Sequence, residues 1–481
     1  MSHIIFKNKL LIVQDEIEKN IENKNLNYFF KYLEKNYKIE INEIKYYFKR
    51  RISENFSRLE PSKYNKNIFK RNNIKFIKSI ILYFLIKFMI FFKKTKKKYN
   101  LQTKILVDDI QNINELNRMV DLLSKFKKEE VVFIKRKNFK HKNKNIVFIL
   151  QEDLKNYSED ILKKYFSVIN LYESYLLFKY SIVSKIDLFE VYKNFLNDFL
   201  YYNTLFSKIK GKVIVQERIL GRTNVVKNYL FKKIHNGRNC YLQTHIFPYD
   251  TQSLFFNCDV FFSMGINSYT TLQNFNAKIN QVIPIGSHSL NYSLLKNKTF
   301  KDEEKILLNI NSDLDILFIG SNVGQNNRNN WEGYYKTIKW LQKISIEKKY
   351  NIYIKHHPSW KKDSKEIKIV KNSKIKYLPN NLDSYFFALK AKVLITYCST
   401  MGYELIPLKK IVYFTDPLDN NNFLNDEIEK DNIVIKSFED LINCIESKKY
   451  ILNSQYDDYG LDYKNTKLFF SKNINKMINI N

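Results

Sequence analysis

The chain has 481 residues, of which 44% are apolar and 15% aromatic, so it is long enough for two domains with sizeable cores. Its 81 Lys and Arg outnumber 49 Asp and Glu, and the formal net charge of +32 favours polyanions such as phosphorylated substrates or anionic lipid. With 10 Gly, 7 Pro and 4 Cys, and no CxxC pair, zinc-finger spacing or repeat, the sequence argues against collagen-like, disulfide-rich and specific nucleic-acid-binding proteins.

The positive charge also has a compositional origin. Lysines are spread along the whole chain, and Asn, Ile, Tyr and Phe are abundant with them, as an AT-rich genome produces. The four isolated cysteines fit a reducing compartment, and the first 20 residues carry charges within their apolar run and no cleavage site. We therefore expect a cytoplasmic protein.

Residues 1–100 form a basic region that we expect to be helical. Within it, residues 80–98 read IILYFLIKFMIFFKKTKKK, thirteen residues that are apolar apart from Lys87, followed by a lysine cluster. The apolar part is too short to span a bilayer, which takes about 20 residues. Two interpretations remain open: a helix at the interface of an anionic membrane, or a buried core helix with a solvated basic end.

From residue 101 to residue 295, short apolar strands alternate with helices, apart from a long helical stretch at 154–208. The strands are expected at residues 103–110, 130–137, 145–153, 212–218, 239–245, 258–265 and 280–286. This alternation predicts a parallel sheet with helices on both faces.

The alternation repeats more clearly in residues 305–450. Strands are expected at residues 314–322, 351–355, 374–379, 392–396 and 410–415, with helices at 330–349, 384–391, 401–408 and 437–449. The charged stretch 294–307 is the expected linker, and residues 451–481 are a helical tail. The predicted fold is α/β, with two Rossmann-like, doubly wound domains facing across a cleft and a helical, basic N-terminal extension.

Three loops of the second domain follow strand ends, where open parallel sheets bind ligands. Gly320 and Ser321 follow the first strand, and Gly320 permits close approach of a ligand to the backbone. Lys355 and His357 follow the second strand and offer donors for a phosphate, before Pro358 stiffens the turn.

A third loop ends where a helix begins. The hydroxyls of Ser399 and Thr400 are placed to hold a phosphate, although such residues before a helix are usually N-caps. Glu404 lies one turn further on and is placed to accept hydrogen bonds from ribose hydroxyls. Together the three loops predict a nucleotide site.

The runs YIKHHP and YLPNNLDSYFFALKAKVLITYCSTMGYELIPLKKIVYF, in this order, resemble the C-terminal half of GT-B glycosyltransferases that build bacterial surface polysaccharides. They are most similar to the group with a K-x-H-P motif and a later Ser-Ser or Ser-Thr motif, which includes CMP-sugar-dependent sialyl-, polysialyl- and Kdo-transferases. CDP-glycerol glycerophosphotransferases of teichoic-acid synthesis share this layout. The resemblance covers about 100 residues well and the first domain by architecture only.

The resemblance implies roles for particular residues. His357 takes the place of the His-Pro histidine that contacts the donor phosphate and assists departure of the nucleotide, and Ser399 and Thr400 take the place of the hydroxyl pair. Fixed donors aimed at that developing charge lower the barrier. Neither a metal nor another cofactor is then expected, and the DLD triplet at residues 313–315 precedes a strand, where it is unsuited to bind one.

A general base for the acceptor hydroxyl is expected from the first domain. The related transferases place an acidic motif there, ending in glycine, and Glu217 in VIVQERILGRTN is the nearest match, without the adjacent second residue of an acidic pair and with Gly221 four residues on. His245 is the alternative base. Arg218 and Arg222 either contact an acidic acceptor or lie on a solvated loop.

The leading interpretation is a metal-independent, inverting glycosyltransferase. It uses a nucleotide-sugar donor, with a CMP-sugar favoured, and a surface polysaccharide or lipid-linked glycan as acceptor. The alternatives are a CDP-polyol phosphotransferase, a nucleotide-sugar epimerase of similar build, and a non-catalytic polyanion-binding scaffold.

Overall fold

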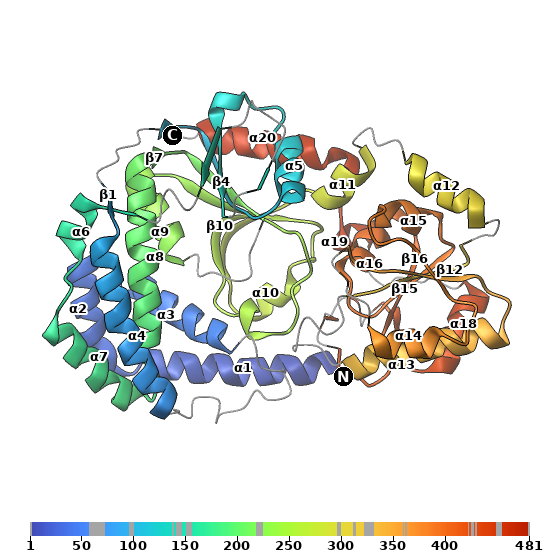
Figure 1. Cartoon of the computed structure of the whole chain (residues 1–481), viewed down its shortest axis with the longest axis horizontal. Coiled ribbons are helices and arrows are strands. Elements are labelled where there is room, and N and C mark those ends of the chain that lie inside the picture. Colours follow the sequence, from blue (N-terminus) through green and yellow to red (C-terminus); the bar gives the residue numbers. More distant parts are fainter. Residues whose placement is uncertain are drawn as a thin grey trace.

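A computed structural model of the chain shows two parallel sheets and a helical region (Figure 1). It describes residues 2–56, 73–95, 101–136, 139–140, 147–150, 156–217, 225–295, 300–310, 314–321, 331–358, 360, 363–421, 423–424, 428, 431–448 and 455–479. Arg218, Gly221, Arg222, Asp313 and Lys96 to Lys98, which the sequence singles out, lie outside the described residues.

The first domain contains a parallel sheet of seven strands in the order β11-β10-β9-β8-β3-β4-β5. The strands are β3 Ile105–Ile110, β4 Val131–Lys135, β5 Val147–Leu150, β8 Val213–Gln216, β9 Arg238–Leu242, β10 Asn257–Ser263 and β11 Lys278–Pro284. Its helices include α5 Ile113–Leu122, α9 Val225–His235 and α10 Thr270–Asn274. The strand order reverses after β3, as in a doubly wound sheet.

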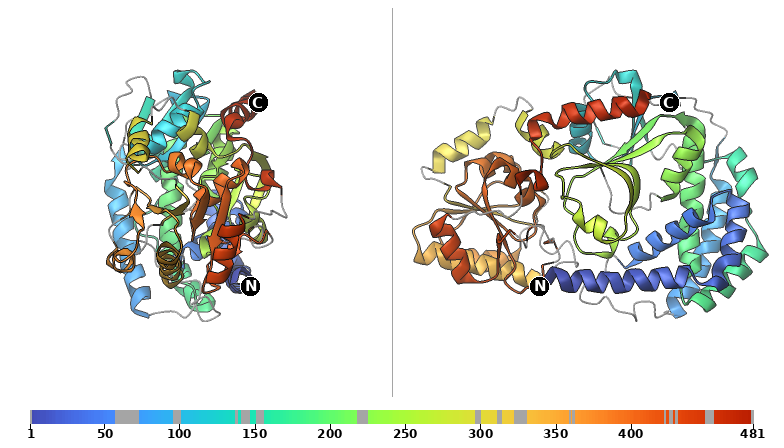
Figure 2. Two further views of the ribbon diagram at one scale, coloured as in Figure 1. Left: turned by 90° about the vertical axis from the view of Figure 1, so that its right-hand side faces the viewer. Right: turned by 180° about the vertical axis from the view of Figure 1, so that it is seen from behind.

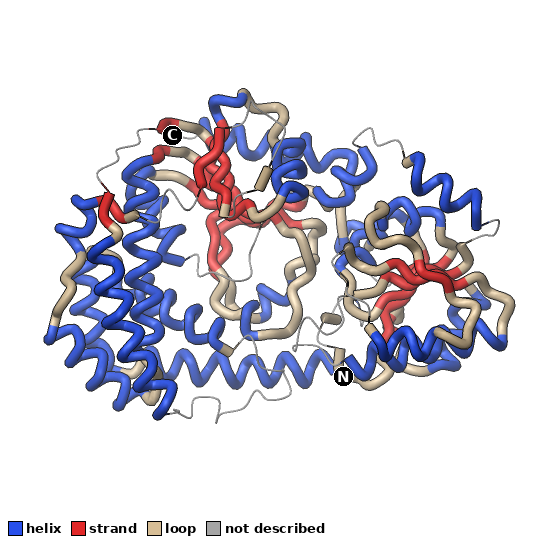
Figure 3. Tube along the Cα trace, in the orientation of Figure 1, coloured by secondary structure: helices blue, strands red, loops and turns tan. Residues whose placement is uncertain are grey.

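The second domain contains a parallel sheet of six strands in the order β14-β13-β12-β15-β16-β17 (Figure 3). The strands are β12 Ile316–Ile319, β13 Ile352–Lys355, β14 Lys376–Tyr377, β15 Val393–Thr396, β16 Ile411–Thr415 and β17 Val434–Ile435. Its described helices include α13 Trp331–Glu347, α14 Ser364–Val370, α15 Ser384–Lys390, α16 Thr400–Leu405 and α18 Phe438–Ser447.

Both faces of this second sheet are buried. Ile316 and Phe318 belong to a core with α13 and α18, whereas Leu317 and Ile319 belong to a separate core with α15 and α16. Successive strand residues point to opposite faces, so an uninterrupted apolar strand such as β12 supplies both cores. The fold is therefore α/β with two Rossmann-like domains in the GT-B arrangement, as the sequence predicts.

A helical region packs beside the first sheet, at the end of the molecule away from the second domain (Figures 1 and 2). It is built from α1 Ser2–Ile21, α2 Asn27–Tyr37, α3 Ile41–Asn55, α4 Asn73–Phe92, α6 Glu159–Tyr165, α7 Leu171–Ser184 and α8 Leu188–Lys208. Helix α8 is its centre, and the rings of Phe195 and Phe199 on α8 lie 5.1 and 4.8 Å from that of Tyr37 on α2. Helix α1 extends from this region towards the second domain.

Short strand pairs tie the helical region to the sheet domain. Strand β1 Lys94–Thr95 pairs with β6 Tyr157–Ser158, and β2 Leu101–Gln102 pairs with β7 Ile209–Lys210. Among the described helices, none combines the length and the apolar character that crossing a membrane requires. The outer face of α4 is nevertheless exposed, so this helix is not enclosed in a core.

Two helices occupy the connection between the domains, where a linker was expected at residues 294–307. Helix α11 spans His288–Leu295, and α12 spans Lys301–Ile310. The tail forms α19 Tyr456–Tyr459 and α20 Thr466–Asn479, and α20 returns to the first domain. There Phe470 packs with Phe262 of β10 at a ring distance of 4.9 Å. The tail follows the second domain in the chain and packs on the first, so it connects the two.

Candidate active site where the two sheets meet

The three predicted donor loops lie side by side. They follow β13, β12 and β15, which are adjacent and parallel, so their carboxyl ends share one edge of the sheet. Ser321 Oγ, after β12, lies 3.0 Å from the Sγ atom of Cys398, after β15. The structure therefore brings these loops together at one sheet edge.

The two adjacent histidines have different surroundings. His356 is 1% exposed, its Nε2 atom lies 2.7 Å from Glu366 Oε1, and its ring stacks on Trp360 at 4.0 Å. His357 is exposed, and desolvation together with the nearby Lys355 charge lowers its pKa. Of the two, only His357 is exposed.

Gly320 has a structural reason to be glycine. A Cβ atom at this position would lie 2.3 Å from His356 Nδ1, a distance that no side chain tolerates. The sequence interpretation assigned the glycine to close approach of a ligand, whereas in the structure the buried His356 ring occupies that space.

Lys355 is turned inwards. Its side chain is 1% exposed, and Nζ donates to the carbonyl oxygens of His356 and Asn380 at 3.2 Å each. Burial lowers the pKa of Lys355 to about 8, although the charges of Asp383 and Glu303 act in the opposite direction. In this conformation the ammonium group braces the loop after β13 and does not point into solvent.

The hydroxyls of Ser399 and Thr400 make different hydrogen bonds. Ser399 is the N-cap of α16, and its Oγ atom accepts from Met401 N at 3.3 Å. Thr400 Oγ1 accepts from the backbone N–H of Ile246, in the first domain, at 3.3 Å. Both residues are partly exposed, and Thr400 marks a point where these loops touch the other domain.

Glu217, which follows β8, is held in a buried ion cluster. Its Oε1 atom lies 2.7 Å from His288 Nε2, and its Oε2 atom accepts from Arg118 at 3.1 Å. Burial alone would raise the pKa of Glu217, but His288 and Arg118 outweigh it and lower the pKa to about 2. Glu217 is therefore a permanently ionised carboxylate of low basicity at neutral pH.

Glu404 is the contrasting carboxyl group. It is 5% exposed, Ser287 Oγ donates to its Oε1 atom at 2.5 Å, and Tyr385 donates to its Oε2 atom at 2.7 Å. Burial raises the pKa of Glu404 to about 7, although these hydrogen bonds and the charge of Arg118 act to lower it. The sequence placed Glu404 against a ribose, whereas the structure places it in a contact between the two domains.

His245 follows β9 at the same junction. Its Nδ1 atom lies 3.0 Å from Thr244 Oγ1, which also reaches the carbonyl oxygen of Glu217 at 3.5 Å. The next residue, Ile246, makes the contact with Thr400. His245 as a whole is partly exposed, whereas Glu217 is buried, but the Nε2 atom of His245 is itself buried.

The sequence interpretation missed four residues of this junction: Arg118, Ser287, His288 and Tyr385. Ser287 and His288 directly follow Gly286, the last residue of an expected strand, so the rule that ligands bind at carboxyl ends of strands identifies them. Gly286 turns the chain with φ +88°, and the next residues enter α11. Arg118 and Tyr385 lie inside helices and carried no such signal.

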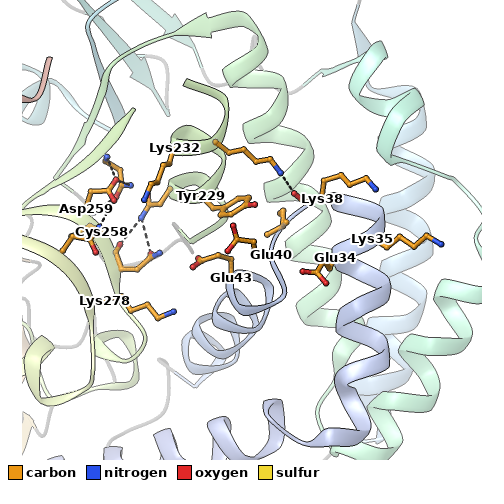
Figure 4. A pocket seen from close by; sticks show the side chains of 16 residues that line it. Glu34, Lys35, Lys38, Glu40, Glu43, Tyr229, Lys232, Cys258, Asp259 and Lys278 are labelled. Atoms are coloured by element: carbon orange, nitrogen blue, oxygen red, sulfur yellow. Dashed lines mark hydrogen bonds between the residues drawn. The ribbon is translucent and has the colours of Figure 1, made fainter. Parts of the chain in front are cut away.

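A separate cavity of about 860 Å³ lies at the opposite, amino ends of β9, β10 and β11, beside α2, α3 and α9 (Figure 4). Its five lysines stand among four acidic residues, so it shows no clear preference for an anion. Burial raises the pKa of Cys258 in its wall far above the ordinary range, which makes that thiol a poor nucleophile. We assign no function to this cavity.

Within the described part of the chain, no group of three or more His, Cys, Asp or Glu side chains is arranged to hold a metal ion. Asp315, of the DLD triplet, accepts from the Asn351 backbone N–H at 3.0 Å and pairs with Lys392 at 2.8 Å. Both contacts are made at the amino end of β12, remote from the donor loops.

Comparison with protein-family models finds no match, and no curated protein matches either. Among solved structures, the chain is similar to UDP-N-acetylglucosamine 2-epimerase from Rickettsia bellii, with 11% identity and a TM-score of 0.45 over 78% of this chain and 96% of that one. It is also similar to UDP-GlcNAc 2-epimerase from Neisseria meningitidis bound to UDP-GlcNAc. The identity is 11% and the TM-score 0.46, over 78% of this chain and 100% of that one. For trehalose-6-phosphate synthase OtsA the identity is 10% and the TM-score 0.40, over 79% of this chain and 98% of that one. At these values the fold assignment rests on the two sheets themselves, and no activity is carried over.

Proposed function

We propose that the chain is a metal-independent, inverting glycosyltransferase that moves a sugar from a nucleotide-activated donor to a surface polysaccharide or lipid-linked glycan. The observation that supports this most is the meeting of carboxyl strand ends from both sheets. Ile246 of one domain binds Thr400 of the other, and Ser287 binds Glu404. A donor held by one domain thus lies within reach of acid–base groups of the other, as group transfer requires.

The donor phosphate would be bound by His357, Ser399 and Thr400. All three are at least partly exposed at one edge of the second sheet, whereas Lys355 and His356 are buried. A CMP-sugar is the favoured donor on the resemblance of the K-x-H-P and Ser-Thr motifs. Hydrogen-bond donors directed at the departing nucleotide phosphate would stabilise its developing charge, so the transfer needs no metal ion.

We assign the general base to His245 and a supporting role to Glu217. A carboxylate with a pKa of about 2 takes up a proton poorly at neutral pH, so Glu217 is poorly suited to be the base. Glu217 instead fixes His288 and Arg118 on the acceptor side. His245→Gln should therefore lower kcat at neutral pH, while Glu217→Gln should lower the stability of the fold as well as activity.

A screen of CMP, CDP, UDP and GDP by thermal unfolding identifies the donor class. A nucleotide at a hundredfold its dissociation constant stabilises the folded state by about 2.7 kcal/mol. Stabilisation by CMP above the other three supports the favoured donor. The absence of an effect from all four would overturn the nucleotide site.

A second candidate is a nucleotide-sugar epimerase. Glu404, with a pKa of about 7, and the fixed carboxylate of Glu217 place two carboxyl groups of different protonation at one junction. In an epimerase, Glu404 would exchange the proton near neutral pH, while Glu217 would stay ionised. The products separate the two functions, because an epimerase leaves the sugar on its nucleotide and a transferase releases the nucleotide.

A further inference from the structure

Helix α4 buries several polar side chains and exposes most of its apolar ones. Ser79, Tyr83 and Lys87 are buried, whereas Phe84, Phe88 and Phe92 are 42%, 57% and 66% exposed. A helix on the surface of a soluble protein normally shows the opposite arrangement. The outward face of α4 therefore exposes a concentration of apolar side chains.

A buried ion pair fixes this orientation. Lys87 Nζ lies 2.9 Å from Glu173 Oε1, and the hydroxyls of Tyr83 and Tyr192 donate to the two oxygens of Glu173 at 2.5 Å each. A buried charge is tolerated only when it is paired and hydrogen-bonded in this way. Turning α4 over would break these contacts, so the exposure of its phenylalanines is built into the fold.

Helix α7 continues the apolar surface. Glu173 belongs to α7, and the ring of Phe178 on α7 lies 6.2 Å from that of Phe76 on α4, so the two helices are neighbours. Both belong to the helical region, at the end of the molecule away from the second domain (Figure 1). Tyr175 and Phe178 on α7 are 55% and 48% exposed, and Leu171 is 78% exposed.

Exposed apolar side chains are concentrated on these two helices. Of the 32 exposed large apolar side chains in the described part of the chain, 15 lie on α4 and α7. A monomeric soluble protein rarely exposes a contiguous apolar patch larger than a few hundred Å². The α4–α7 surface is therefore a site of association.

The charged side chains of α4 and α7 indicate which kind of partner this surface suits. Glu173 is the only acidic residue of the two helices, and it is buried; their exposed charges are Lys75, Lys78 and Lys179. A second copy of the chain would bring lysines against lysines across a twofold axis with no acid to pair them. An anionic lipid surface offers both an apolar layer and negative headgroups.

We propose that α4 and α7 lie flat on an anionic bilayer, with their apolar side chains at the boundary of headgroups and acyl chains and their lysines at the phosphates. Helix α4, at 20 residues, gives a contact about 30 Å long by its rise of 1.5 Å per residue. The proposal stands on the α4–α7 surface alone and does not depend on the proposed transferase activity.

The test is sedimentation of the full chain with vesicles of phosphatidylglycerol and phosphatidylcholine in equal parts, and with phosphatidylcholine alone. The parent should pellet with the mixed vesicles and much less with the neutral ones. Phe88→Gln/Phe178→Gln should reduce the bound fraction at least about tenfold, since each ring loses its apolar environment. Lys75→Gln/Lys78→Gln/Lys179→Gln should weaken binding to the anionic vesicles and reduce its sensitivity to salt.

The matched control is Ile346→Gln/Ile367→Gln, which changes two exposed apolar residues of the second domain and should bind as the parent does. All changed side chains are exposed, so the midpoint temperature of thermal unfolding of each variant should stay within a few degrees of that of the parent. A parent that remains in the supernatant overturns the proposal, as does equal binding by Phe88→Gln/Phe178→Gln. A vesicle-free dimer that this variant dissociates would show instead that the surface serves self-association.

Discussion

Glu404 makes the stability of the protein depend on pH in an unusual direction. The folded protein holds its proton up to about pH 7, whereas the unfolded chain releases it near the ordinary pKa of 4.5. Folding is therefore favoured by this group below pH 4.5, and the advantage is lost as the pH rises from 4.5 to 7. Glu404→Gln keeps the size of the side chain and removes the titration.

The expected magnitude follows from the shift. One pKa unit corresponds to about 1.4 kcal/mol, so the parent should lose roughly 2–3 kcal/mol relative to Glu404→Gln between pH 5 and pH 8. Urea unfolding of both proteins at the two pH values measures their free energies of unfolding. The contribution of Glu217 to the pH dependence cancels in the comparison, because both proteins contain this residue. If the difference between parent and variant is the same at pH 5 and pH 8, Glu404 does not carry the proton and the reasoning fails.

Three further predictions concern the donor side and its neighbours. His357→Ala should lower turnover by about 10²-fold. His356→Ala should chiefly destabilise the fold, because it removes a buried contact with Glu366 and the stacking on Trp360; the reverse result would mean that the motif is out of register by one residue. Ser399→Ala/Thr400→Ala should weaken nucleotide binding in calorimetry, and unchanged affinity would remove both hydroxyls from the site. Glu217→Gln should remove stability that the parent has above pH 4.5 and loses as the pH falls towards 2, which acid titration of the two proteins compares.

The fold was predictable because its signals are local. Strands such as β12 and β15 are uninterrupted apolar runs, and such runs between amphipathic helices specify a parallel sheet buried on both faces. The His-Pro motif likewise selected His357, which is exposed in the structure. These features depend on near neighbours in the sequence.

The junction was less predictable because its partners are distant in sequence. Glu217 meets His288 across 71 residues and Arg118 across 99, and Ser287 meets Glu404 across 117. No spacing rule joins such residues, and both pKa shifts arise from burial and from these contacts. The same reason applies to α4, whose apolar run was evident while its exposure depends on the pairing of Lys87 with Glu173 on α7.

The central claim is group transfer from a nucleotide-activated sugar, and the most direct measurement follows the sugar. Purified protein is incubated with bacterial membranes and a panel of nucleotide sugars labelled in the sugar, beginning with CMP-sugars. The account predicts that label enters a glycan or lipid-linked glycan with equal release of nucleotide, without added metal and not with His357→Ala. Label that stays on the nucleotide as an altered sugar, or no conversion of any donor, would contradict it.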